Sequence, residues 1–188
     1  MSDPWSTWTA FEGERRLRTG SRAEAAGAAH AALAMAEGPI LLIEDATGRV
    51  VDLDLRGSAA EVAARYAPPP VPPRPRGRPK LGVVAREVTL LPRHWDWLNT
   101  QSGGASAAVR RLVDQARQAD GGKSAARARQ DAAYRFMSSM AGDLPGYEEA
   151  IRALYASDRD RFEGLVAEWP ADLRDHAVRL AWSQRNPV

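Results

Sequence analysis

The sequence contains no cysteine and only three histidines. The lack of cysteine excludes disulfides, thiolate metal ligands and cysteine nucleophiles, and it fits a reducing compartment. His30, His94 and His176 form no HxxxH or HExxH pair, so we expect no histidine metal site and no cofactor. No apolar run approaches the ~18 residues that a membrane helix needs, and residues 1–5 carry no features of a secretory signal. We therefore expect a cytoplasmic protein that does not contact membranes.

Lysine is also scarce, because the 26 basic residues of this 188-residue chain include only two lysines. The formal net charge of +2 conceals an uneven distribution. Residues 1–67 sum to −3, residues 68–129 to +8, and residues 130–188 to −3. A basic middle between two acidic ends indicates a polyanionic partner for the middle.

The clearest boundary is the segment from Pro68 to Pro79, PPPVPPRPRGRP, with seven prolines in 12 residues. Such a run cannot form a helix or a central strand, and it predicts an extended linker. We therefore divide the chain into a small α+β domain (1–67), a Pro/Arg-rich linker (68–82), a middle unit (83–120) and a helical domain (121–188). The expected fold class is α+β.

The first piece is expected to have the order ββαββα. Strands are predicted at 8–11, 15–19, 40–44 and 50–55, and capping boxes at Ser21/Glu24 and Ser58/Glu61 predict the starts of two helices. The last piece is expected to be a helical bundle. Its helices are predicted at 123–140, after Asp143, after Ser157 and after Pro170.

The hexapeptide Pro-Arg-Gly-Arg-Pro-Lys at 75–80 resembles the AT-hook, a peptide that binds the minor groove of A/T-rich DNA. The resemblance implies that Gly77 lets the backbone approach the groove floor while Arg76 and Arg78 lie along it. Arg74 and Lys80 would reach phosphates. The alternative is a basic, solubilising linker without a DNA role.

Residues 86–118, REVTLLPRHWDWLNTQSGGASAAVRRLVDQARQ, resemble the ribbon-helix-helix fold of bacterial regulators and antitoxins. The resemblance implies a homodimer whose paired strands enter the major groove, with Arg86 on the ribbon. Ser106 is expected to cap the second helix, whose N-terminus would bind a phosphate, and Arg110 is a further expected contact. In the family's register Arg86, Val88 and Leu90 face the groove, whereas apolar alternation alone would bury Val88 and Leu90. A plain helical hairpin is the alternative.

The whole chain also resembles an uncharacterised family of proteins conserved in bacteria. The segments that carry the resemblance are RGRPKLGVVAREVTLLPRHWDWL, YRFMSSMAGDLPGYEEA and WPADLRDHAVRLA. This resemblance implies no activity.

Three functions are compatible with these patterns. The first is a DNA-binding protein, nucleoid-associated or a transcriptional regulator, that binds double-stranded A/T-rich DNA as a homodimer. The second is a dimerising adaptor that binds other proteins, including through its terminal domains, and does not bind DNA. The third is an enzyme that would use Asp52 and Asp54 as a carboxylate pair, but no partnering base accompanies them, so we expect no enzymatic activity.

Overall fold

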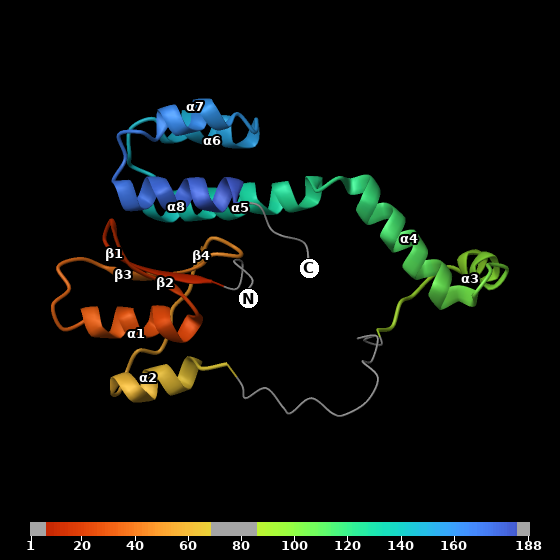
Figure 1. Cartoon of the computed structure of the whole chain (residues 1–188), viewed down its shortest axis with the longest axis horizontal. Coiled ribbons are helices and arrows are strands. Elements are labelled where there is room, and N and C mark those ends of the chain that lie inside the picture. Colours follow the sequence, from red (N-terminus) through yellow and green to blue (C-terminus); the bar gives the residue numbers. More distant parts are fainter. Residues whose placement is uncertain (1–6, 69–85, 184–188) are drawn as a thin grey trace. The chain divides into compact units, whose positions relative to one another are not determined.

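The computed structural model describes residues 7–68 and 86–183. Within these residues the chain forms one four-stranded antiparallel sheet and eight helices, so the expected α+β class is confirmed (Figure 1). The described residues fall into two compact units. Residues 7–68 together with 124–183 form one, called here the sheet unit, and residues 86–123 form the other, called the hairpin unit.

The sheet has the strand order β2-β1-β3-β4, and every neighbouring pair is antiparallel. Its strands are β1 (Trp8–Glu12), β2 (Arg15–Gly20), β3 (Ile40–Glu44) and β4 (Arg49–Val50). Strand β1 is central because it pairs along its whole length with both β2 and β3. The register with β2 shifts between Ala10 and Phe11, which marks a bulge.

Six helices belong to the sheet unit. They are α1 (Arg22–Ala32), α2 (Ala59–Tyr66), α5 (Lys123–Met140, of which residue 123 lies in the hairpin unit), α6 (Tyr147–Tyr155), α7 (Arg159–Leu165) and α8 (Ala171–Trp182). Capping boxes begin α1 and α2, as the sequence predicts: the hydroxyl of Ser21 accepts from the Glu24 backbone N–H, and that of Ser58 accepts from the Glu61 backbone N–H.

Two helix starts differ from the sequence-based expectation. Helix α6 begins behind Gly146, which has φ +74°, and not directly after Asp143. Leu144 precedes a proline, and this position disfavours helical dihedral angles. Helix α7 is capped by Asp158, which accepts a hydrogen bond from Arg161, and not by Ser157, which adopts a positive φ of 59°.

Both faces of the sheet are buried, and successive residues of a strand point to different cores. Ala10 and Leu42 belong to a core shared with α1 and α2. Phe11 and Ile43 belong to a larger core built with α5, α6, α7 and α8. Figure 1 shows α1 and α2 on one side of the sheet and α5 and α8 on the other.

The sheet thus joins the two terminal pieces, which the sequence-based division treats as separate domains. The reason lies in β1 and β3, which carry apolar side chains on both faces, while the first piece supplies helices for only one face. Without a cover, the other apolar face of the sheet would be exposed to water at a cost in free energy. The C-terminal helices cover this face.

The turn between β3 and β4 holds this junction together. Gly48 has φ +67°, and a Cβ at this position would lie 1.8 Å from the carbonyl oxygen of Ala132 in α5. The backbone of the turn therefore lies directly against α5, an approach that only glycine allows. Arg135 of α5 donates to the carbonyl of Thr47, 3.1 Å away.

The hairpin unit consists of α3 (Pro92–Asn99) and α4 (Gly104–Asp120). The proline is the first residue of α3, where its missing N–H costs nothing. The two helices are joined through Gly103 and Gly104, which have φ +82° and +76°. Among the described residues of this unit, only the side chains of Leu98 and Ala108 are buried.

No described helix combines the length and the apolar character that crossing a bilayer requires.

Candidate nucleic-acid interface

The apolar side of the hairpin unit is uncovered. Trp97 is 50% exposed, Leu112 42% and Val113 51%, although such side chains are usually buried in a globular unit. These side chains face a shallow groove of about 430 Å³ between Leu90, which precedes α3, and the two helices. Its lining includes Leu90, Trp97, Leu98, Val109, Leu112 and Val113.

The hairpin unit is too small to be stable through its own core. Units of fewer than about 40 residues usually need disulfides, a metal or association with another chain. The sequence has no cysteine, and the described residues contain no cluster of acidic or histidine side chains suited to a metal ion. The uncovered groove is therefore the feature of this unit to consider as a surface for association.

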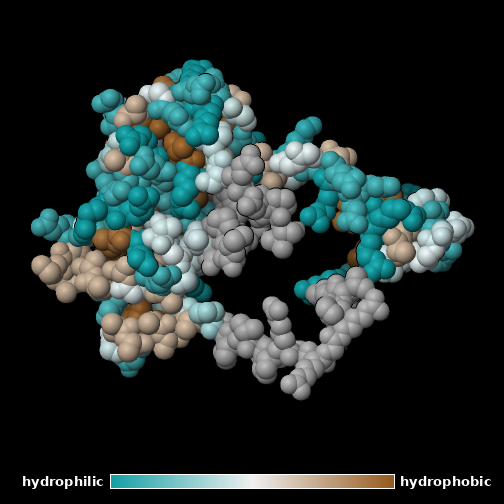
Figure 2. Space-filling model, in the orientation of Figure 1, coloured by the Kyte–Doolittle hydropathy of each residue, from teal (hydrophilic) through white to brown (hydrophobic). Residues whose placement is uncertain are grey.

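A neighbouring side of α4 is basic. At 100° per residue, Arg110 and Arg117 lie almost in line along the helix, and Arg111 lies about 100° further around it. All three side chains are exposed. In Figure 2 the side of α4 toward the viewer is largely hydrophilic. Helix α4 therefore separates an apolar side from a cationic side.

The cations of the hairpin unit have no carboxylate partners among the described residues. Within this part of the chain, no ion pair forms at Arg86, Arg93, Arg110, Arg111, Arg117 or Lys123. Residues 86–123 hold six basic and four acidic side chains, so a net charge of +2 is left to solvent ions, which a polyanion can displace with a gain in free energy.

The arginines of the sheet unit are different, since most of them pair with a carboxylate. The pairs on helix surfaces include Arg127 with Asp131 and Arg159 with Glu163, both at i, i+4 spacing. Ion pairs also hold Arg15, Arg16, Arg18, Arg56, Arg65, Arg152, Arg161, Arg174 and Arg179. The basic side chains of the hairpin unit therefore differ from most arginines of the sheet unit in lacking a contacting carboxylate within the described residues.

The residues that the sequence singles out for DNA contact fall into two groups. Arg74, Arg76, Gly77, Arg78 and Lys80 lie outside the described residues. The other three belong to the hairpin unit and are exposed: Arg86, Ser106 and Arg110.

The expected capping role of Ser106 is wrong. It is the third residue of α4, whose N-cap is Gly103, and Gly103 offers no side chain to the helix. The two glycines begin the helix earlier because their positive φ angles make the tight turn from α3. Ser106 remains in the first turn, beside backbone N–H groups that lack partners within the helix.

The segment 86–91, expected to be a strand, has no regular secondary structure and belongs to no sheet in the single chain. Val88 is 58% exposed and Leu91 50%. A ribbon of the expected kind would form only when the same segment of a second copy pairs with it.

A buried polar cluster in the sheet unit was not anticipated from the sequence. Asp45 follows β3, and its carboxylate accepts hydrogen bonds from the hydroxyl of Thr9 at 3.0 Å and from the guanidinium of Arg179 at 2.8 Å. Nε2 of His176 lies 3.4 Å from the same carboxylate, without the geometry of a hydrogen bond. His176 and Asp45 are both fully buried.

The cluster sets the charge states of its members. Burial lowers the pKa of His176; Asp45 opposes this effect, and the positive charge of Arg179 adds to it. Burial alone would raise the pKa of Asp45, but His176 and Arg179 outweigh it and lower that pKa. Nδ1 of His176 lies 3.1 Å from the Arg179 guanidinium, which can only donate, so this nitrogen accepts and the imidazole is neutral. The cluster ties the β3–β4 turn to α8.

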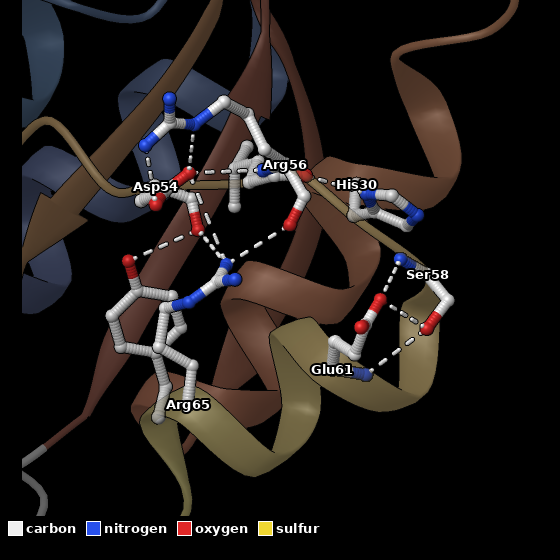
Figure 3. Close-up of polar contacts among 8 residues, drawn as sticks. His30, Asp54, Arg56, Ser58, Glu61 and Arg65 are labelled. Carbon is white, nitrogen blue, oxygen red and sulfur yellow. Dashed lines mark hydrogen bonds and ion pairs between the residues drawn. The ribbon is translucent and has the colours of Figure 1, made fainter.

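Asp54 does not have the surroundings of a catalytic carboxylate. Figure 3 shows its side chain between the guanidinium groups of Arg56 and Arg65. Hydrogen bonds from Arg56 hold the pKa of Asp54 well below its usual range. Its carbonyl oxygen accepts from Arg65 at 2.6 Å and from the hydroxyl of Tyr66 at 3.1 Å, so the group attaches the segment before α2 to that helix.

The comparison with known proteins agrees with the resemblance seen in the sequence. No curated protein and no solved structure matches the chain significantly. One family profile matches residues 7–181, a range that spans both the sheet unit and the hairpin unit. The chain therefore belongs to the family described as "Uncharacterized protein conserved in bacteria (DUF2239)".

Proposed function

We propose that this chain is a DNA-binding protein, nucleoid-associated or a transcriptional regulator, that acts as a homodimer. The AT-hook-like segment, with Arg74, Arg76, Gly77, Arg78 and Lys80, contacts the minor groove of A/T-rich DNA. The hairpin unit dimerises in the manner of a ribbon-helix-helix protein and places Arg86, Ser106 and Arg110 near the duplex.

The observation that carries this proposal is the set of unpaired cations in the hairpin unit. Most arginines of the sheet unit have carboxylate partners, whereas those of the hairpin unit have none among the described residues. They directly follow, in sequence, a segment in which four more cations occur between residues 74 and 80. Release of the counterions from such a set is the main source of affinity for a duplex.

Dimerisation is supported by the uncovered groove between α3 and α4. Burying Trp97, Leu112 and Val113 against the same residues of a second copy would supply the core that one hairpin lacks. Two AT-hook-like segments in one dimer would also bind one duplex with raised effective concentration.

Mobility-shift titrations of the full chain with A/T-rich and G/C-rich duplexes of equal length test the minor-groove contact. We expect tighter binding to the A/T-rich duplex, and we expect Arg76→Ala with Arg78→Ala to remove most of that preference. A preference that survives in the double variant would contradict the role of this segment.

The same groove favours a second candidate, an adaptor that binds another protein and no DNA. Its apolar lining could take a partner helix as readily as a second copy. Purification at low and at high salt separates the two candidates. An adaptor would keep a protein partner at high salt and carry no nucleic acid at low salt. The DNA-binding dimer would carry nucleic acid at low salt and keep no other protein at high salt.

A further inference from the structure

We propose that the line of Arg110 and Arg117 on α4 is a docking surface for the phosphate backbone of a nucleic-acid duplex. This surface would bind DNA in addition to the AT-hook-like segment, and it would contact phosphates and not bases. This inference rests on the proposed DNA binding and assigns to the exposed side of α4 a contact that neither the linker nor the strand segment supplies.

The spacing of the two arginines suits a backbone. Seven residues separate them, which is about two helical turns and about 10.5 Å along the helix axis. Phosphates of one strand follow one another every ~3.4 Å along the axis of a duplex. Because the backbone also winds around that axis, neighbouring phosphates are farther apart in space than this rise, and the two guanidinium groups are spaced to reach two different phosphates of one strand.

The surface stays available when the groove is covered. At 100° per residue, Arg110 lies about 60° and Arg117 about 40° around α4 from Val113, so both flank the side that lines the groove. Their long side chains can extend past the edge of the groove and keep the guanidinium groups in solvent when a partner covers its apolar residues. Backbone docking and association can therefore occur together.

An ordinary solvated helix face would look different in this protein. On α5, α6 and α7 of the sheet unit, exposed arginines at comparable positions pair with carboxylates three or four residues away. On α4, Asp114 lies four residues after Arg110 and three before Arg117, yet it forms an ion pair with neither. The two guanidinium groups remain available to an external anion.

Asp114 lies between the two arginines on the same side of the helix. Its carboxylate would repel a phosphate that both arginines approach, so it weakens the surface that they form. The proposal therefore predicts effects of opposite sign for neighbouring residues: loss of binding when the arginines are neutralised, and gain when Asp114 is neutralised.

The test measures the binding of the full chain to one duplex over a series of salt concentrations. Four proteins are compared. They are the wild type, the double variant Arg110→Gln with Arg117→Gln, the single variant Asp114→Asn, and a control double variant, Arg152→Gln with Arg159→Gln. The control removes the same charge from the sheet unit, where both arginines are already paired. Circular dichroism and gel filtration of each variant show whether folding and association are unchanged.

We expect the slope of log K against log[salt] to become shallower by about 1.8 for each copy that docks, from ~0.9 per phosphate contact, in the Arg110/Arg117 variant. The A/T preference should remain, Asp114→Asn should bind several-fold more tightly than the wild type, and the control should match the wild type. A wild-type slope in a folded Arg110/Arg117 variant, or equal losses in the control, would overturn the docking surface while DNA binding stands. A wild type that binds no duplex at any salt concentration would overturn the proposed function itself.

Discussion

The two units of this chain differ in how far they bury their apolar side chains and pair their charged ones. The sheet unit buries two apolar cores on the two faces of one sheet and pairs most of its arginines with carboxylates. The hairpin unit buries two side chains among its described residues and leaves its cations unpaired there. One unit is complete in itself, whereas the other presents an apolar side and a cationic side that both lack partners.

The difference indicates where stability and binding reside. Exposed apolar side chains and uncompensated charge both cost free energy unless something covers them. A chain that combines such a hairpin with a well-packed unit is expected to use the hairpin for contacts with other molecules. This division of roles between the two units can be broken by experiment.

The largest effect is expected at the turn that joins the halves of the sheet unit. Gly48→Ala brings a methyl group into the backbone of α5 and should reduce the free energy of unfolding by more than about 3 kcal/mol. Gly13→Ala is the matched control, since Gly13 also has a positive φ of 53° but open space around it, and it should cost only about 1–2 kcal/mol. Urea unfolding measures both. Equal losses in the two variants would mean that backbone strain, and not the contact with α5, is the reason why Gly48→Ala is destabilising.

The next effect is expected in the groove of the hairpin unit. Leu112→Glu puts a charge among apolar side chains that a second copy would cover, so the variant should be monomeric at concentrations where the wild type is a dimer. Sedimentation equilibrium measures the association. Gln118→Glu adds the same charge to the other side of α4 and should leave the dimer intact. If both variants stay dimeric, the groove is not the dimer interface.

A smaller effect is expected from acid on the sheet unit. The pKa of His176 is lowered in the folded protein, whereas an unfolded histidine titrates near 6.5. As pH falls through about 6.5, this histidine is protonated in the unfolded chain but stays neutral in the folded protein. The free energy of unfolding therefore falls by up to ~1.4 kcal/mol per pH unit. The lowered pKa of Asp45 adds a loss only below about pH 4, its unfolded value.

The variant His176→Gln isolates this histidine, because it cannot titrate. Urea unfolding at pH 7 and pH 5 should show a smaller difference between the two conditions in the variant than in the wild type. An identical pH dependence in both proteins would mean that His176 does not carry the acid sensitivity of the sheet unit.

Much of the sheet unit could be predicted from local signals. The boxes at Ser21 and Ser58 and the long helix from Lys123 to Met140 depend on neighbours in sequence, and they occur where the sequence predicts them. The joining of residues 7–68 with 124–183 depends on contacts between distant segments. The apolar residues of β1 and β3 on both faces were the one signal that could have revealed it.

The buried cluster could not be predicted for the same reason. Asp45 lies in a turn and His176 in a helix 131 residues later, and nothing local links them. Part of the candidate interface could be predicted, because the net charge of each segment can be summed from the sequence without a structure. That the arginines of α4 lack carboxylate partners among the described residues, while most arginines on the helices of the sheet unit have them, could be seen only in the folded chain.

The most direct test of the central claim is the salt dependence of duplex binding by the unaltered full chain. If Arg74, Arg76, Arg78, Lys80 and Arg110 each displace a counterion, the slope of log K against log[salt] should lie near −4 to −5, at ~0.9 per contact. Contacts from Arg117 and from a second copy would make it steeper. Binding that does not respond to salt, or no binding at low salt where ionic attraction is strongest, would contradict the account.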